Sequence, residues 1–142
     1  MNQAPDKIKS IGWFFYDSKN KMVCLHKRND DAPESKNTWD YFGGAREEKD
    51  KTAEDALRRE LQEELGMNFE KNKISLLSTN GKNIYVIFAS IHGFRKMKLG
   101  EGAGFAWLYL DYAIKHLENL SLDARNQLQK FETETRQFGI IN

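Results

Sequence analysis

The sequence contains few of the features that mark extracellular or membrane proteins. It has one cysteine, Cys24, so no disulfide can form within the chain, which favours a reducing compartment. No apolar run approaches the roughly 20 residues that a membrane-spanning helix needs, and Met1–Ser10 lacks the apolar core of a signal peptide. We therefore expect a cytoplasmic protein that does not interact with membranes, with Cys24 as a small buried strand residue rather than a nucleophile.

An excess of charge of either sign is also missing. The 22 basic and 21 acidic residues give a net charge of +1. Without a strong overall field, we expect no binding to a nucleic-acid polymer, and any ligand must depend on a local site. Two basic clusters could attract phosphates, although a solvated basic edge is the more ordinary explanation. They comprise Lys27 and Arg28, and Arg95, Lys96 and Lys98.

What remains is the composition of one ordinary domain. Hydrophobic residues make up 39% and charged residues 30% of the 142 residues, a mixture typical of a water-soluble globular protein. Neither a repeat nor a linker-like stretch interrupts the chain. We therefore expect a single domain over residues 1–142.

The hydrophobic pattern predicts strands and helices in alternation. Strands are expected at Ile11–Tyr16, Lys21–His26, Ile74–Leu77, Ile84–Ile91 and Phe105–Leu110, and helices at Thr52–Leu65 and Leu122–Phe138. Residues 17–20 should form a hairpin turn, and the polar segment 29–37 a surface loop. This order implies an α/β domain in which a mixed β-sheet lies between helices.

The first predicted helix has clear start and stop signals. Thr52, followed three residues later by Asp55, is typical of a capping box, and Gly66 is a stop signal directly after Leu65. An apolar stripe runs along this helix at Ala53, Leu57, Leu61 and Leu65. The segment should therefore pack one face against the sheet.

Three glutamates lie next to that apolar stripe. Glu60 and Glu63 fall on the adjoining arc, and Glu64 falls within the stripe itself, between the positions of Ala53 and Leu57. Like charges at this spacing repel one another. A divalent cation would offset the repulsion, since Mg²⁺ and Ca²⁺ prefer carboxylate oxygens. The alternative is a solvated acidic face that forms surface pairs with the neighbouring arginines.

The spacing favours the metal. From Arg59 the chain has the form R-E-U-x-E-E-x-G-U, where U is aliphatic, and Gly43-Gly44 precede it by a short charged loop. This resembles the Nudix box of the Nudix hydrolases, G-x5-E-x7-R-E-U-x-E-E-x-G-U. The second half matches at every specified position: Arg59, Glu60, Leu61, Glu63, Glu64, Gly66 and Met67.

The first half of the box departs from the pattern. Gly44 stands fifteen residues before Arg59, one more than the pattern has, so the loop into the helix is one residue longer. The first acid of the box falls on Asp50 when counted from Gly44, but on Lys51 when counted back from Arg59. In the family this acid pairs with the box arginine. Asp50, Glu47 and Glu48 are the candidates here.

A second segment resembles the same family. Gly100–Trp107 is similar to the loop E-G-x4-W of the MutT-like branch, in which the glutamate either ligates a metal or acts as the base for water. Glu101 matches that glutamate. Its alternative interpretation is an ordinary loop residue.

The resemblance implies a Nudix-type α/β/α sandwich and a function. The family uses Mg²⁺, for which Mn²⁺ can substitute, to cleave a phosphoanhydride bond in a substrate that contains a nucleoside diphosphate. Implied substrates are a nucleoside triphosphate, a nucleotide sugar or a dinucleotide polyphosphate, and the family's habit of dimerising implies a homodimer.

The resemblance also implies roles for individual residues. Glu60 and Glu64 would be the principal metal ligands, with Glu63 a further ligand or an acceptor beside them. The backbone carbonyl of Gly43 would reach the metal, since a glycine turn allows the main chain to approach closely. Arg59 would orient the glutamates, and Glu101 would be the base or the remaining ligand.

Other interpretations stay open. A Nudix-fold domain can bind a nucleotide without cleaving it, and the displaced first acid is compatible with that. The aromatic residues of the segment Trp39–Phe42 could stack on a base or pack in the core. His26, His92 and His116 show no ligand spacing, which is typical of ordinary strand or surface residues.

Overall fold

The sheet is organised around its first strand. The computed structural model describes residues 10–28, 37–79, 81–94 and 104–138. Strand β1 (Ser10–Asp17) is buried along almost its whole length, and the side chains from Trp13 to Tyr16 are 0% exposed. Successive side chains of a strand point to opposite faces of the sheet. Both faces must therefore be covered, which explains why this strand is a continuous apolar run.

Six further strands complete a mixed sheet. β1 pairs antiparallel with β2 (Met22–Lys27) and β4 (Phe42–Ala45), and parallel with β6 (Asn83–Phe88). β5 (Ile74–Ser78) adds to β6, while β3 (Trp39–Asp40) and β7 (Gly104–Tyr109) pair with β2, all three antiparallel. The hairpin of β1 and β2 confirms the expectation from the sequence.

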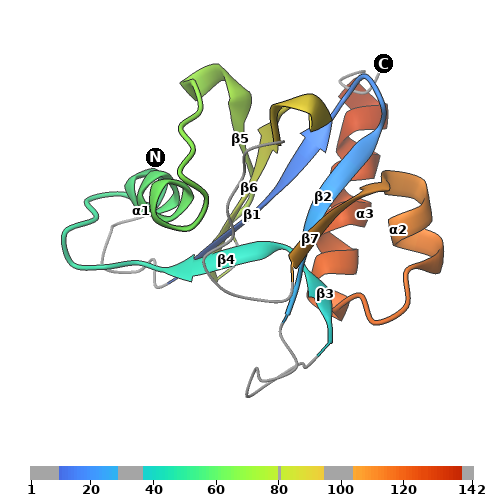
Figure 1. Cartoon of the computed structure of the whole chain (residues 1–142), viewed down its shortest axis with the longest axis horizontal. Helices are drawn as coiled ribbons and strands as arrows, with labels where there is room; N and C mark the ends of the chain where they lie inside the picture. Colours follow the sequence, from blue (N-terminus) through green and yellow to red (C-terminus); the bar gives the residue numbers. More distant parts are fainter. Residues whose placement is uncertain (1–9, 29–36, 80, 95–103, 139–142) are drawn as a thin grey trace.

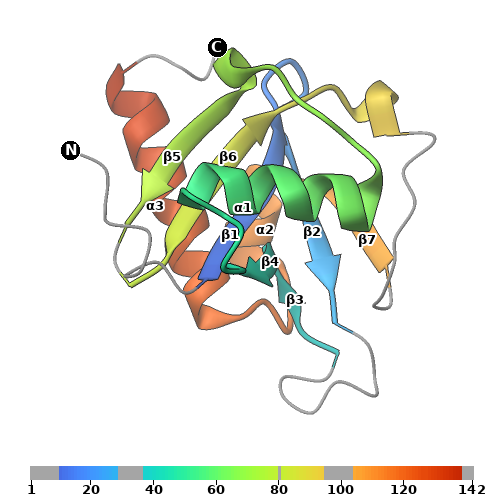
Figure 2. The same cartoon turned by 90° about the vertical axis from the view of Figure 1, so that its left-hand side faces the viewer.

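Helices cover the two faces of this sheet (Figures 1 and 2). α1 (Ala53–Glu60) continues into a π-helical turn, η2 (Leu61–Leu65), on one face. α2 (Leu110–His116) and α3 (Leu122–Phe138) lie together on the other. Two short 3₁₀ turns, η3 (Lys71–Lys73) and η4 (Ile91–Phe94), precede β5 and follow β6. The arrangement confirms the expected α/β sandwich.

Each face of the sheet has its own hydrophobic core. Trp13 and Phe15 point toward α1, where the ring of Trp13 stacks on Phe42 at 5.5 Å between centroids. Phe14 and Tyr16 point toward α3 and meet the ring of Phe131 edge-on. The sheet therefore separates the hydrophobic core under α1 from the one under α2 and α3.

Several details differ from the sequence prediction, which did not include β3 and β4. The strand expected at Ile84–Ile91 ends at Phe88, because the backbone N–H of Ile91 donates to the Asp17 carboxylate at 3.0 Å and η4 begins there. The strand expected at Phe105–Leu110 ends one residue early. Leu110 instead begins α2, a third helix that the sequence analysis did not identify.

The contacts of α2 explain why it was missed. It has only seven residues and no side-chain cap at its start. The N–H of Leu110 donates to the Lys21 carbonyl at 3.0 Å. At the other end, the guanidinium of Arg125 on α3 donates to the carbonyls of Ile114 and Leu117. The end groups of this helix are thus satisfied by distant segments, which no local pattern reveals.

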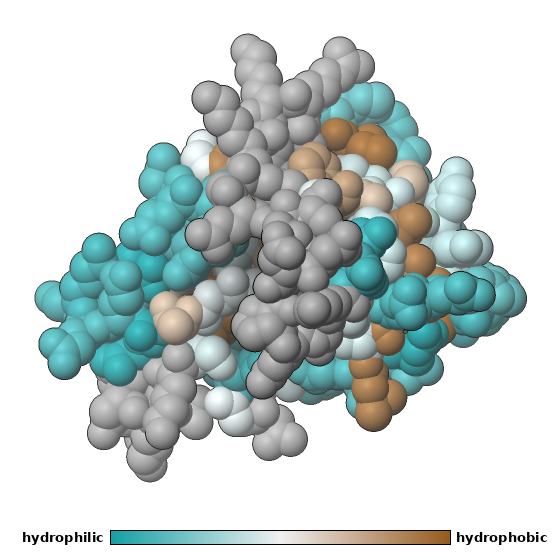
Figure 3. Space-filling model, turned by 60° about the horizontal axis from the view of Figure 1, so that its bottom comes forward, coloured by the Kyte–Doolittle hydropathy of each residue, from teal (hydrophilic) through white to brown (hydrophobic). Residues whose placement is uncertain are grey.

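The surface differs between the two sides. In the view of Figure 3, the described side chains on the α1 side are mostly hydrophilic, and hydrophobic ones lie toward α2 and α3. Tyr109, Tyr112 and Leu122, from this second side, are 62%, 48% and 74% exposed. None of the described helices is long and apolar enough to cross a membrane.

The close packing of Gly12 gives a test of the fold. A Cβ at this position would lie 2.5 Å from Cε1 of Tyr41 and 2.9 Å from Cδ1 of Ile84. Gly12→Ala is therefore expected to lower the free energy of unfolding by about 1–3 kcal/mol, measured by urea denaturation. Gly93→Ala is the control, since none of the described residues has an atom within 4 Å of its added Cβ. Equal losses in the two variants would contradict the packing described.

Candidate active site at the end of helix α1

The acidic helix is fixed at both ends. The N–H of Asp55 donates to Oγ1 of Thr52 at 3.1 Å, and the N–H of Thr52 donates back to the Asp55 carboxylate at 3.2 Å. This confirms the capping box. Gly66 ends the helical segment with a φ of 63°, a conformation that favours glycine. The apolar stripe is buried as expected, and it comprises Ala53, Leu57, Leu61 and Leu65.

Arg59 forms hydrogen bonds with most of the other residues of the site. Its Nε lies 3.1 Å from both carboxylate oxygens of Asp50, and its Nη2 donates to one of them at 2.9 Å. Nη2 also donates to the Ala45 carbonyl at 2.7 Å. Nη1 donates to Glu60 at 2.9 Å and to Glu63 at 3.1 Å. One guanidinium thus joins the loop after β4 to two of the three box glutamates.

Asp50 is the first acid of the box. Its side chain is buried, whereas Lys51 is exposed and Glu47 forms only a peripheral ion pair with Arg59 at 3.5 Å. Of the three candidate acids, Asp50 is therefore the main partner of Arg59, in agreement with the count forward from Gly44. Hydrogen bonds from Arg59 hold the pKa of Asp50 below its usual range, and Asp50 in turn raises the pKa of Arg59.

The loop itself supports Asp50. The N–H of Glu47 donates to the Asp50 carboxylate at 2.8 Å, and the N–H of Asp50 donates back to the Glu47 carbonyl at 2.9 Å. Nε of Arg46 donates to the Asp50 carbonyl at 3.2 Å. The carboxylate is therefore held from its own loop as well as from the helix.

Glu60 lies against the paired glycines. Its side chain is 12% exposed, and a Cβ on Gly44 would overlap its carboxylate carbon. Only glycine at position 44 leaves room for this contact. Gly43, the other glycine, pairs with Gly12 across β4 and β1 and is exposed. The structure thus brings the Glu60 carboxylate next to the backbone of β4.

The other predicted residues are placed less tightly. Glu63 has a side chain that is 53% exposed, and Glu64 is half-buried. Glu101 lies outside the described residues, as do Arg95, Lys96 and Lys98. The structure therefore brings together Arg59, Glu60 and Glu63 with the Gly43–Gly44 backbone.

The donors suit magnesium, although they form no closed cage. Among residues 10–28, 37–79, 81–94 and 104–138, no three His, Cys, Asp or Glu side chains are arranged to hold a metal ion. The carboxylates of Glu60 and Glu63 instead accept hydrogen bonds from Arg59. Mg²⁺ usually keeps several waters and shares its coordination with substrate phosphates, so it needs only a few carboxylates. Carboxylates from one helix, beside backbone without a Cβ, fit that requirement.

Among the alternative candidates, Tyr41, Phe42 and Cys24 are buried, His26 and Trp39 are half-buried, and His92 and His116 are exposed. Tyr41 and Phe42 are 8% and 1% exposed, and the ring of His26 stacks on Phe42 at 5.3 Å. Trp39 is half-buried, with the Lys27 ammonium 5.8 Å from its ring centroid. Cys24 is fully buried in β2, as expected, and burial raises the pKa of its thiol, which disfavours the reactive thiolate.

One polar cluster has no counterpart in the sequence analysis. The Tyr41 hydroxyl donates to the Asp123 carboxylate and accepts from Nζ of Lys82 at 2.8 Å. Asp40 accepts from Oγ of Ser121 at 3.0 Å, and burial raises the pKa of its carboxyl. These residues lie far apart in the sequence, so no spacing could have identified them. They tie the strand that leads to Gly43-Gly44 to the start of α3.

The Arg59–Asp50 pair makes a testable contribution to stability. Asp50→Ala leaves the guanidinium without its main partner and should lower the free energy of unfolding by about 3 kcal/mol at neutral pH. The lowered pKa of Asp50 means that this contribution is present above about pH 4 and is lost as the pH falls through the folded-state pKa.

Urea denaturation at about pH 7 and about pH 3 checks both points, and the difference between wild type and variant should shrink at the lower pH. Glu48→Ala removes an exposed acid from the same loop and should change stability by less than about 0.5 kcal/mol. A pH-independent difference for Asp50→Ala would show that its charge is not responsible.

Solved structures share the fold. The MutT protein from Methanosarcina mazei superimposes with a TM-score of 0.63 at 20% identity, over 96% of this chain and 99% of that one. The dihydroneopterin triphosphate pyrophosphohydrolase of E. coli gives 0.64 at 19%, over 89% and 98%. The NUDIX domain of NrtR from Shewanella oneidensis, complexed with ADP ribose, gives 0.65 at 17%, over 90% and 88%.

The sequence comparisons assign the family. Among curated proteins, none matches this sequence. The model of the NUDIX domain matches residues 6–131, a range that includes the glycine pair, Asp50 and the whole of the acidic helix. By this match, together with the box on α1 and the shared fold, the chain belongs to the Nudix family.

Proposed function

We propose that this protein is a Mg²⁺-dependent pyrophosphohydrolase that cleaves a phosphoanhydride bond in a nucleoside-diphosphate-linked substrate, of the nucleoside triphosphate or nucleotide-sugar type. The observation that carries the proposal is the position of Glu60. Its carboxylate is held by Arg59 and packed against the bare backbone of Gly44, at the end of a helix that carries two more glutamates.

The proposed metal ligands are Glu60 and Glu64, with Glu63 and the Gly43 carbonyl beside them. A bound Mg²⁺ would neutralise the diphosphate charge and lower the pKa of a coordinated water. Arg59 fixes the orientation of Glu60 and Glu63, because its own guanidinium is anchored by buried Asp50. Glu101 is the proposed base that accepts the proton of the attacking water.

A domain that binds a nucleotide without cleaving it is the alternative. Its main support was the displaced first acid of the box. Since Asp50 occupies that position and pairs with Arg59, the departure from the pattern no longer favours an inactive site. The cytoplasm remains the expected compartment, in keeping with one cysteine that is buried.

The first experiment tests the metal site. Phosphate or pyrophosphate release is measured from a panel of nucleoside triphosphates, nucleotide sugars and dinucleotide polyphosphates, with Mg²⁺, with Mn²⁺ and with EDTA. Glu64→Gln is near-isosteric and should reduce release to background while the protein stays folded. Glu70→Gln is the matched control, an exposed glutamate after the helix that should keep full activity. Full activity of Glu64→Gln would exclude the proposed ligand set.

The second experiment tests the base. Glu101→Gln should lower kcat by about 10²–10⁴-fold, the range for general-base catalysis, with little change in the affinity for Mn²⁺ if Glu101 is not a ligand. Glu118→Gln is its control, because Glu118 is exposed and has no proposed role. A kcat within a few-fold of wild type would place the base elsewhere.

A further inference from the structure

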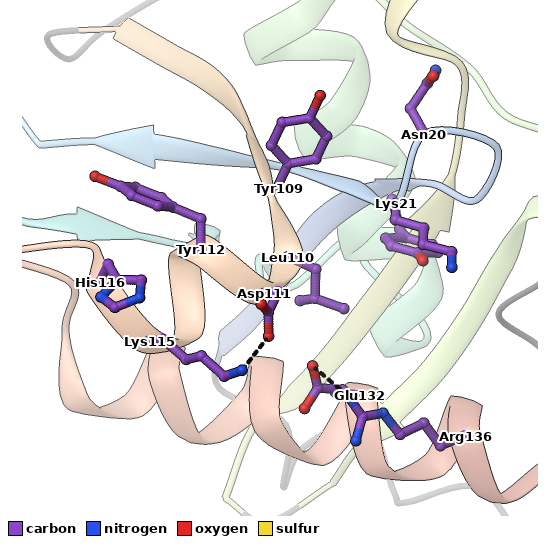
Figure 4. A pocket seen from close by; sticks show the side chains of 11 residues that line it. Asn20, Lys21, Tyr109, Leu110, Asp111, Tyr112, Lys115, His116, Glu132 and Arg136 are labelled. Carbon is purple, nitrogen blue, oxygen red and sulfur yellow. Dashed lines mark ion pairs between the residues drawn. The ribbon is translucent and has the colours of Figure 1, made fainter.

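A cavity lies on the face of the sheet opposite the Nudix box. It is open to solvent, has a volume of about 820 Å³, and is lined by residues of the β1–β2 turn, the end of β7, α2 and the C-terminal half of α3 (Figure 4). Small-molecule sites usually measure about 300–1,000 Å³. None of Arg59, Glu60, Glu63 or Glu64 lines it. A ligand bound in this cavity would therefore contact none of these four residues of the box.

One part of this cavity is aromatic. Tyr112 and His116 line it, and both are exposed, Tyr112 to 48%. The ring of Tyr112 lies 5.8 Å from that of His116, one turn further along α2. Exposed rings side by side offer π-faces on which a flat ligand can stack.

The other part carries positive charge. Lys115 and Arg136 are paired with Asp111 and Glu132, at 3.0 Å and 3.6 Å. Each pair joins residues four apart on its own helix, and both cations are well exposed. Such pairs contribute little to the stability of the fold, so either cation can exchange its partner for a ligand. In Figure 4, Arg136 lies at the end of the cavity away from Tyr112 and His116.

Lys21 adds a cation without a counter-ion. No ion pair of Lys21 occurs in the part of the chain that the structure describes. Its backbone is fixed, because its carbonyl accepts from the N–H of Leu110 at 3.0 Å and its φ is 58°. In Figure 4 its side chain lies on the same side as Arg136. The lining residues thus keep one uncompensated positive charge.

A buried hydroxyl lies in the wall of the cavity. Tyr16 is 0% exposed, and its hydroxyl has no hydrogen-bond partner among the described residues. Buried polar groups are nearly always paired. Burial, and secondarily the charge of Asp17, raise the pKa of Tyr16, so the hydroxyl keeps its proton. Tyr16 also lines a smaller cavity of about 420 Å³ on the other side of the turn.

We propose that this cavity binds a nucleoside monophosphate, which carries both a planar aromatic ring and an anionic group, with the ring against Tyr112 and His116 and the anionic group toward Lys21 and Arg136. Rings at one end and exchangeable cations at the other match a ligand that carries both. The site is separate from the box and does not depend on the proposed hydrolase activity.

Calorimetric titration of the full chain in EDTA tests the proposal. The probes are adenosine monophosphate, adenosine and inorganic phosphate. Adenosine monophosphate should bind saturably, and each half alone should bind at least about ten-fold more weakly, because stacking and charge both contribute. Phosphate that binds as tightly as the nucleotide would overturn the aromatic part of the assignment.

Variants locate the bound probe. Tyr112→Ala and Lys21→Gln should each weaken binding of adenosine monophosphate by about five-fold or more. Both residues are exposed, so the fold should persist, which the melting temperature checks. Lys130→Ala, an exposed lysine of α3 outside the cavity, is the matched control and should leave binding unchanged.

The double variant Glu60→Gln/Glu64→Gln separates this site from the box. It should bind adenosine monophosphate as wild type does, whether or not the protein hydrolyses any substrate of the panel. Binding that is lost in this double variant but unchanged in Tyr112→Ala would place the nucleotide in the box and overturn the proposal. Absence of saturable binding would also overturn it.

Discussion

The hydrogen bonds of the Arg59 guanidinium to the Asp50 carboxylate are the constraint on which the candidate active site depends. Both side chains are largely removed from water. A charge in such a buried position is very unfavourable unless it has a partner of opposite charge. The pair therefore has to form, and when it does it joins the loop after β4 to the end of α1. The remaining donors of Arg59 then fall beside Glu60 and Glu63. The orientation of the glutamates is thus a consequence of satisfying one buried cation.

A second constraint is the burial of β1 on both faces. Trp13 and Phe15 need α1 to cover them, whereas Phe14 and Tyr16 need α3. The sheet consequently separates two sets of chemistry. The face beside α1 carries the box, and the face beside α2 and α3 carries the cavity with exposed Tyr112 and the Tyr16 hydroxyl, which has no hydrogen-bond partner among the described residues. Sites on opposite faces can bind different ligands without sharing a residue.

Local patterns predicted the elements that are stabilised locally. The helix that begins after Thr52 has its own cap, stop signal and apolar stripe, and the hairpin of β1 and β2 has its own turn. Elements whose ends are set by distant contacts were predicted less well. β6 ends at Phe88, and the N–H of Ile91, three residues further on, donates to the Asp17 carboxylate. α2 depends on Lys21 and Arg125 for its end groups.

The sequence by itself determined the family resemblance and the candidate ligands, because the spacing of Arg59, Glu60, Glu63 and Glu64 along one helix needs no other part of the chain. Only the tertiary structure decided which acid serves as the first of the box. Counting residues gave Asp50 or Lys51, since a one-residue insertion can be placed on either side. The choice depends on which side chain reaches the buried guanidinium, and in the folded protein that is Asp50. The cavity beside α2 likewise exists only once the turn, β7 and two helices meet, because none of these segments contains it alone.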